Sequence, residues 1–168
     1  MRKVIAVLAL AALMPATTVA AQGTLGMEKQ ILPVTTANWA AFRNYDGRQW
    51  IYFTHLVTYR CGLEEIRYSV NSTALDETFP LPPCDPQNPN AIDPVAHPPY
   101  IVLPLGSAAQ LAIRVTYTDG EESDVVVLAP CDVTGDQTCA VQVEASPDAP
   151  DPQPAAKNRR SGKAPDKQ

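Results

Sequence analysis

Residues 111–128 read LAIRVTYTDGEESDVVVL, and this stretch decides the fold class. Up to Tyr117, the large apolar residues alternate with alanine, arginine and threonine, and this period of two predicts a strand with one buried face. Asp119-Gly120 then supplies the residues that a tight primed turn needs, and Val125 to Leu128 returns as an apolar run. We therefore predict an antiparallel β-hairpin.

Four further segments have a strand pattern. Residues 49–61 are aromatic and β-branched on both faces, which predicts a central strand that pairs as a hairpin with the alternating residues 66–70. Residues 100–103 predict an edge strand, because Pro104 ends it and proline donates no ladder hydrogen bond. Residues 140–144 predict a last strand.

Residues 35–45 support two interpretations. Thr36 could cap a short helix in which Trp39 and Phe42 are three residues apart. Alternatively, the Asp46-Gly47 pair that follows is a hairpin turn between two strands.

Residues 76–99 contain eight prolines, which exclude a regular helix or a central strand. A loop of this length in a compact domain is usually functional or disordered. We expect Cys84 to tether it. Its first part could present an extended polyproline ridge to a partner, the alternative being a rigid spacer over a sheet edge. The residues of this candidate interaction loop are Phe79, Pro80, Leu81, Pro82 and Pro83.

Together these segments predict an all-β fold. We expect an antiparallel β-sandwich of immunoglobulin-like size with about six or seven strands, formed by residues 22–145. The antibody pattern of two cysteines with a tryptophan between them is not recognisable. Architecture of this kind does not define a function.

The amino-terminal residues have the pattern of a secretory signal peptide. A basic residue pair at 2–3 precedes an apolar run at 4–14 and small residues at 19–21. The apolar run is about half of what a membrane-spanning helix needs. We expect a signal peptide at residues 1–21, no transmembrane anchor, and a location in the periplasm or outside the cell.

Four cysteines follow this segment. An even number in an exported chain predicts two disulfides. Of three connectivities we favour Cys61 with Cys84 and Cys131 with Cys139, because each pair is close in sequence. A zinc site is disfavoured because the chain has no Cys-x-x-Cys pair, and we expect no metal and no cofactor.

The charge distribution disfavours a nucleic-acid partner. The formal net charge is −5, and residues 22–145 are more acidic still.

Residues 146–168 contain no aromatic or branched aliphatic residue, which predicts a disordered tail. Basic residues at its end could make weak contact with an anionic surface.

Few residues suggest chemistry. His55, on the predicted central strand, is either a hydrogen-bonded core histidine or the general base of a hydrolase, and His97 is expected to be exposed. Asn71-Ser72-Thr73 fits the glycosylation sequon. Two clusters of acidic residues could bind calcium or could be solvated turn residues. These groups are Asp119, Glu121, Glu122 and Asp124, and separately Asp132 and Asp136.

The functional expectation follows mainly from the absence of a catalytic motif. We expect an exported, soluble, non-enzymatic interaction or accessory module that contacts an unidentified protein or other component of the cell envelope. The alternatives are a small hydrolase that uses His55 or clustered carboxylates, and a calcium-stabilised structural domain.

Overall fold

The computed structural model describes residues 26–132 and 137–145. The predicted signal peptide at 1–21, the tail at 146–168 and Asp136 lie outside the described residues. Short helical segments occupy α1 (Glu28–Ile31), η1 (Leu32–Val34), η2 (Thr36–Asn38), α2 (Thr54–Thr58) and η3 (Arg60–Gly62). The strands are β1 (Ala41–Tyr45), β2 (Arg48–Tyr52), β3 (Leu63–Val70), β4 (Glu77–Phe79), β5 (Tyr100–Pro104), β6 (Leu111–Tyr117), β7 (Val126–Ala129) and β8 (Val141–Gln142).

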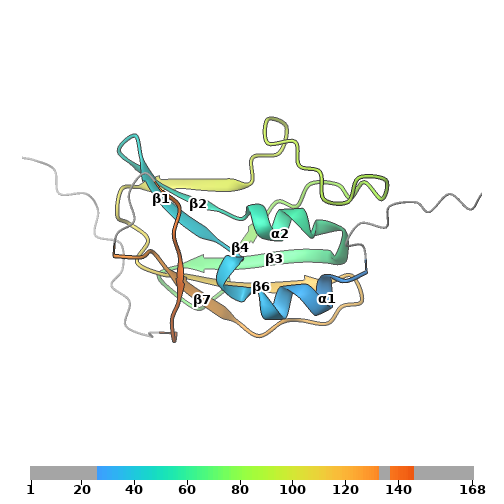
Figure 1. Ribbon diagram of the computed structural model, residues 1–168. Coiled ribbons are helices and arrows are strands. Elements are labelled where there is room, and N and C mark those ends of the chain that lie inside the picture. Colours follow the sequence, from blue (N-terminus) through green and yellow to red (C-terminus); the bar gives the residue numbers. More distant parts are fainter. Residues whose placement is uncertain (1–25, 133–136, 146–168) are drawn as a thin grey trace, which may run out of the picture.

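The strands form two antiparallel sheets, as the all-β prediction requires. One sheet has the order β1-β2-β5 and the other has the order β4-β3-β6-β7-β8. Figure 1 shows β1 and β2 in one layer and β3, β6 and β7 in the other. The described residues thus contain eight strands, one more than the upper end of the expected range.

The core lies between the two layers. Phe42 and Ile51 project from the three-stranded sheet, and Ile66, Ile113 and Leu128 project from the five-stranded sheet; all five are fully buried. Burial of an aliphatic or aromatic side chain of this size stabilises a fold by about 1.5–3 kcal/mol. One face of β1 and β2 therefore packs into the core, and the other face of these two strands lies outside it.

The predicted hairpin at residues 111–128 is confirmed, because β6 pairs antiparallel with β7. Its turn differs from the predicted primed type. The Gly120 N–H donates to the Tyr117 carbonyl, and the Tyr117 N–H donates to the Glu121 carbonyl, both at 2.8 Å. Gly120 has a positive φ of 82°, whereas Asp119 does not have a positive φ. These hydrogen bonds enclose a loop of three residues, 118–120. A primed two-residue turn at Asp119-Gly120 would need a positive φ at Asp119.

The primed turn is found at Asp46-Gly47 instead. These residues have φ values of 50° and 66° and join β1 to β2 directly, with Tyr45 paired to Arg48. The hairpin interpretation of this region is thus confirmed, and the helix interpretation is wrong beyond the single turn of η2, Thr36–Asn38. The positive φ values explain the aspartate and glycine, which tolerate that conformation best.

The predicted central strand at 49–61 is wrong after Tyr52. Residues Thr54–Thr58 form α2, so His55 lies on a helix. Phe53, Leu56, Val57 and Arg60 are buried, and their spacing of three and four residues matches a helical period rather than a strand period. The predicted pairing with residues 66–70 is also wrong, since β2 pairs with β1 and β5 while β3 pairs with β4 and β6.

The remaining strand predictions are confirmed. Strand β5 lies at the edge of its sheet and ends at Pro104, and β8 lies at the edge of the other sheet. The proline-rich region contains only one strand in the described chain, β4, which is also an edge strand. This placement agrees with the exclusion of proline from central strands.

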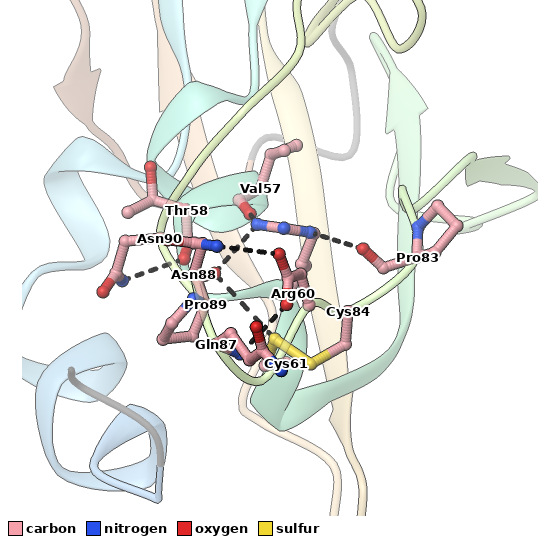
Figure 2. The surroundings of a disulfide bond; sticks show 11 residues. Val57, Thr58, Arg60, Cys61, Pro83, Cys84, Gln87, Asn88, Pro89 and Asn90 are labelled. Carbon is pink, nitrogen blue, oxygen red and sulfur yellow. Dashed lines mark hydrogen bonds between the residues drawn. A yellow bond between two sulfur atoms is a disulfide. The ribbon is translucent and has the colours of Figure 1, made fainter. Parts of the chain in front are cut away.

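The proline-rich loop is fastened to the sandwich around Arg60, whose exposed fraction is 6%. Its Nε donates to the Pro83 carbonyl and its Nη1 donates to the Pro89 carbonyl, both at 2.9 Å. The neighbouring Cys61 forms a disulfide with Cys84, and Figure 2 shows the guanidinium beside this bond. The Asn90 side chain adds a hydrogen bond to the Thr58 carbonyl at 3.1 Å. Residues 83–90 of the loop are therefore held on α2 and η3.

In the described part of the chain, no helix has the length and apolar character needed to cross a membrane.

Candidate functional site

The outer face of the β1-β2-β5 sheet carries an unusual set of side chains. Side chains alternate between the two faces of a strand, and the inward positions are filled by residues such as Phe42, Gln49 and Ile51. The register then places a second set of side chains together on the outer side. This set, which we call the aromatic face, consists of Arg43, Tyr45, Arg48, Trp50, Tyr52 and Tyr100.

Three of these aromatic rings contact one another across β2 and β5. The ring centroids of Trp50 and Tyr100 are 4.8 Å apart, and those of Tyr52 and Tyr100 are 5.6 Å apart in an edge-on arrangement. The Trp50 and Tyr52 rings are nearly parallel, at 16°, with centroids 6.4 Å apart. Such separations lie within the range of favourable aromatic pairs. The three rings therefore form one continuous surface.

Neighbouring groups fix the orientation of this surface. The Trp50 indole N–H donates to the Tyr45 carbonyl at 3.2 Å. The guanidinium carbon of Arg43 lies 4.5 Å from the Tyr45 ring centroid, which is a cation–π distance. Tyr45 itself is 50% exposed, and Val102, the outward residue opposite Trp50, is 38% exposed. The aromatic face is thus ordered yet accessible at its margins.

His55 has the environment of a structural histidine. Its Nε2 lies 2.9 Å from the Thr35 hydroxyl, which itself donates to the Ile31 carbonyl at 2.8 Å. The His55 and Tyr59 rings meet edge-on at 5.1 Å. Burial lowers the pKa of His55. Among the described residues, no carboxylate hydrogen-bonds to this imidazole, so the orienting group that a general base normally uses is not found there.

Carboxylates of the acidic cluster at the tip of the β6–β7 hairpin form ion pairs with basic side chains. Lys29 of α1 pairs with Asp119 and Glu121, and Arg114 pairs with Glu122 at 3.0 Å. The hydrogen bond from Lys29 holds the pKa of the Asp119 carboxyl below its usual range. No group of three metal-ligating side chains occurs within residues 26–132 and 137–145. The tip therefore joins α1 to the hairpin.

The predicted interaction loop is divided between core and surface. Phe79 is 2% exposed, and its ring centroid is 4.5 Å from that of Phe53. Leu81 packs against the same core, while Pro80 and Pro83 are exposed. Pro82 lies with Pro83 beside Arg60, at a surface pocket. The five residues therefore do not form one exposed ridge.

The predicted cysteines are paired, and two other predicted residues are exposed. The structure contains both disulfides in the favoured pairing, Cys61–Cys84 and Cys131–Cys139. His97 is exposed at the end of the proline-rich loop, and Asp132 is exposed beside Cys131.

The glycosylation sequon has its asparagine engaged in the fold. Asn71 Nδ2 donates to the Ser107 carbonyl at 2.7 Å, and Asn71 Oδ1 accepts from the Ala109 N–H at 2.7 Å. The Asn71 side chain thus joins the end of β3 to the segment that precedes β6.

The fold and site define an antiparallel β-sandwich with an arginine-flanked aromatic face and two disulfides. The chain matches no protein-family model, no curated protein and no solved structure. Its function must therefore be inferred from its own residues.

The aromatic face is not evident from the sequence pattern, which predicts that Trp50 and Tyr52 lie on a strand buried on both sides. Their outward direction could have been recognised from their alternation in Arg48–Tyr52, where arginine, tryptophan and tyrosine alternate with glutamine and isoleucine. Tyr100 could not have been assigned to the aromatic face from the sequence, because its pairing with Tyr52 depends on the order of strands in the sheet.

Proposed function

We propose that this chain is an exported, non-enzymatic binding module of the cell envelope, located in the periplasm or secreted, and that it binds polysaccharide on the aromatic face. The observation that carries the proposal is the contact of Trp50, Tyr52 and Tyr100 on the outer side of a small sheet. Two disulfides fit an oxidising compartment. The signal peptide pattern at residues 1–21 gives the same expectation.

Sugar rings suit this surface chemically. The C–H bonds on the flat side of a pyranose carry partial positive charge, whereas the face of an aromatic ring is negative. Stacking also removes apolar area of both partners from water. Tyrosine and tryptophan add polar groups at the ring edges, which can hydrogen-bond to sugar hydroxyls.

The rigidity of the face supports binding rather than catalysis. The Trp50 indole is held by the Tyr45 carbonyl, and the sheet fixes the spacing of the three rings. A pre-ordered surface loses little conformational entropy when a ligand binds. The aromatic face contains no histidine and no pair of carboxylates, the groups that a hydrolase would need at the ligand.

The proposal is tested by co-sedimentation of the purified full chain with insoluble cellulose and with peptidoglycan sacculi, and by affinity electrophoresis in polygalacturonate. We expect at least one polysaccharide to bind. Trp50→Ala and Tyr100→Ala should weaken that binding by more than about tenfold, since truncation of a central aromatic anchor costs about 2 kcal/mol or more. The matched control is Val34→Ala, at a site that is 80% exposed and lies outside the aromatic face.

Two results would reject the proposal. One is the failure of every polysaccharide to bind while circular dichroism shows a folded chain. The other is binding that survives Trp50→Ala but is lost in the double variant Pro80→Ala with Pro83→Ala, which would assign the interaction to the proline-rich loop.

A further inference from the structure

The charge of the aromatic face differs from that of the rest of the chain. The chain has a formal net charge of −5, yet the aromatic face contains two arginines, Arg43 and Arg48. The other outward positions of the three strands are Ala41, Val102 and Pro104, so no described outward position carries a carboxylate. The nearest carboxylate in sequence is Asp46, in the turn at one end.

Most other lysine and arginine side chains of the described residues are engaged by the fold, and Arg67 of β3 is the exception. Lys29 and Arg114 are paired with carboxylates, and Arg60 is buried against backbone carbonyls. None of the ion pairs between described residues includes Arg43 or Arg48. The Nε of Arg43 is buried, so a ligand on this face would be bound by the terminal nitrogens of the guanidinium. A planar guanidinium is well suited to bind a carboxylate through two parallel hydrogen bonds.

The register places each arginine next to an aromatic residue. Arg43 is the direct cross-strand neighbour of Trp50, and Arg48 is the direct neighbour of Tyr45. Adjacent strands are about 4.8 Å apart. A sugar ring stacked on Trp50 would therefore bring a substituent at its edge within reach of Arg43.

Resting on the proposed function, we infer that the ligand is an acidic polysaccharide. Its uronate-type carboxylates bind to Arg43 and Arg48 while its sugar rings stack on Trp50, Tyr52 and Tyr100. Two cations on a face of an otherwise acidic protein match a polymer with spaced charges. A nucleic acid carries a phosphate at every nucleotide and would require a denser cationic surface.

A second copy of the chain fits the face less well. In a two-fold symmetric dimer the same patch occurs on both sides of the interface. Because this patch contains arginines and no carboxylate, self-association through it would bring like charges together.

The test compares polygalacturonate with the same polymer after full methyl esterification, which removes the charge but retains the sugar rings and linkage. Affinity electrophoresis or calorimetry of the full chain should show about tenfold tighter binding to the acid form at low salt, with the difference shrinking as salt screens the charges. Arg48→Gln, and the double variant Arg43→Gln with Arg48→Gln, should abolish this preference while binding of the ester persists. Arg67→Gln, an exposed arginine on β3, is the matched control.

The outcomes separate the two proposals. Equal, Trp50-dependent binding of acid and ester would overturn the acidic ligand and leave polysaccharide binding intact. Failure of both forms and of the insoluble polysaccharides would reject the proposed function itself. Tighter Trp50-dependent binding of single-stranded DNA than of polygalacturonate would overturn the assignment to a glycan. A dimer that is detected by sedimentation and is lost in the double variant Arg43→Gln with Arg48→Gln would assign the face to self-association.

Discussion

The Gln49 side chain hydrogen-bonds to both backbone groups of Ala108. Its Nε2 donates to the Ala108 carbonyl at 3.1 Å, and its Oε1 accepts from the Ala108 N–H at 2.7 Å. Gln49 belongs to β2, whereas Ala108 precedes β6 of the other sheet, and both are 2% exposed. The amide thus links the strand that carries Trp50 to the opposite layer.

Replacement of this amide should destabilise the fold. Gln49→Met keeps a side chain of similar length but leaves the buried Ala108 N–H and carbonyl without partners, at about 1–3 kcal/mol for each group. We expect the free energy of unfolding to fall by about 2–6 kcal/mol, measured by urea denaturation. Gln87→Met, on the exposed part of the proline-rich loop, should leave the urea midpoint almost unchanged.

Arg60 should control the order of the proline-rich loop. Arg60→Lys keeps the charge but cannot donate simultaneously to the Pro83 and Pro89 carbonyls in the guanidinium geometry. Hydrogen bonds from a charged donor contribute about 1.5–3 kcal/mol each. Hydrogen exchange at the Asn88, Ala91 and His97 amides should therefore accelerate by roughly tenfold or more.

The control for this exchange experiment is Arg67→Lys, which alters an exposed arginine of β3. Unchanged exchange in the loop of the Arg60 variant would show that the disulfide and the Asn90 hydrogen bond hold the loop without Arg60.

The two disulfides should contribute unequally. Cys61 and Cys84 are separated by 23 residues, whereas Cys131 and Cys139 are separated by 8. In the loop-entropy treatment these lengths correspond to about 3.4 and about 2.5 kcal/mol. Urea denaturation of the paired serine variants should show the larger loss for Cys61→Ser with Cys84→Ser. The reverse order would mean that the smaller loop stabilises the fold by native contacts.

Stability should rise with pH around the titration range of His55. Burial lowers the pKa of His55 in the folded state, so the unfolded chain binds the proton more tightly. The contribution of His55 is fully present above the unfolded pKa of about 6.5 and is lost as pH falls from there toward the folded pKa. The urea midpoint should therefore decrease as the pH is lowered from neutral to mildly acidic values.

His55→Gln should remove this slope. The slope is separable from that of the carboxylates, because the Lys29 hydrogen bond lowers the pKa of Asp119, and such a group loses its stabilisation only at more acidic pH. An identical slope in His55→Gln would refute the assignment to this imidazole.

Local patterns in the sequence predicted much of the sandwich. The alternation in Leu111–Tyr117 and the Asp46-Gly47 pair are properties of a few neighbouring residues, and both gave hairpins. Residues 53–60 could not be assigned in this way, because β-branched and aromatic residues favour strands while the buried positions follow a helical spacing. Packing against the core overrides the local preference there.

The candidate site was less predictable than the fold. The aromatic face joins Arg43 of β1, Trp50 of β2 and Tyr100 of β5, and the last of these is separated from the others by the entire β3–β4 region. Strand order in a sheet is set by long-range contacts that a single sequence does not reveal. The disulfide pairs, by contrast, are close in sequence and could be predicted.

The most direct test uses the two tryptophans of the chain. Trp39 is 1% exposed in the core, whereas Trp50 lies on the aromatic face. In ¹⁹F NMR of the full chain labelled with 5-fluorotryptophan, titration with polygalacturonate should shift the Trp50 resonance, assigned with Trp50→Phe, and leave the Trp39 resonance in place. A stationary Trp50 resonance at polymer concentrations that saturate binding would contradict the central claim.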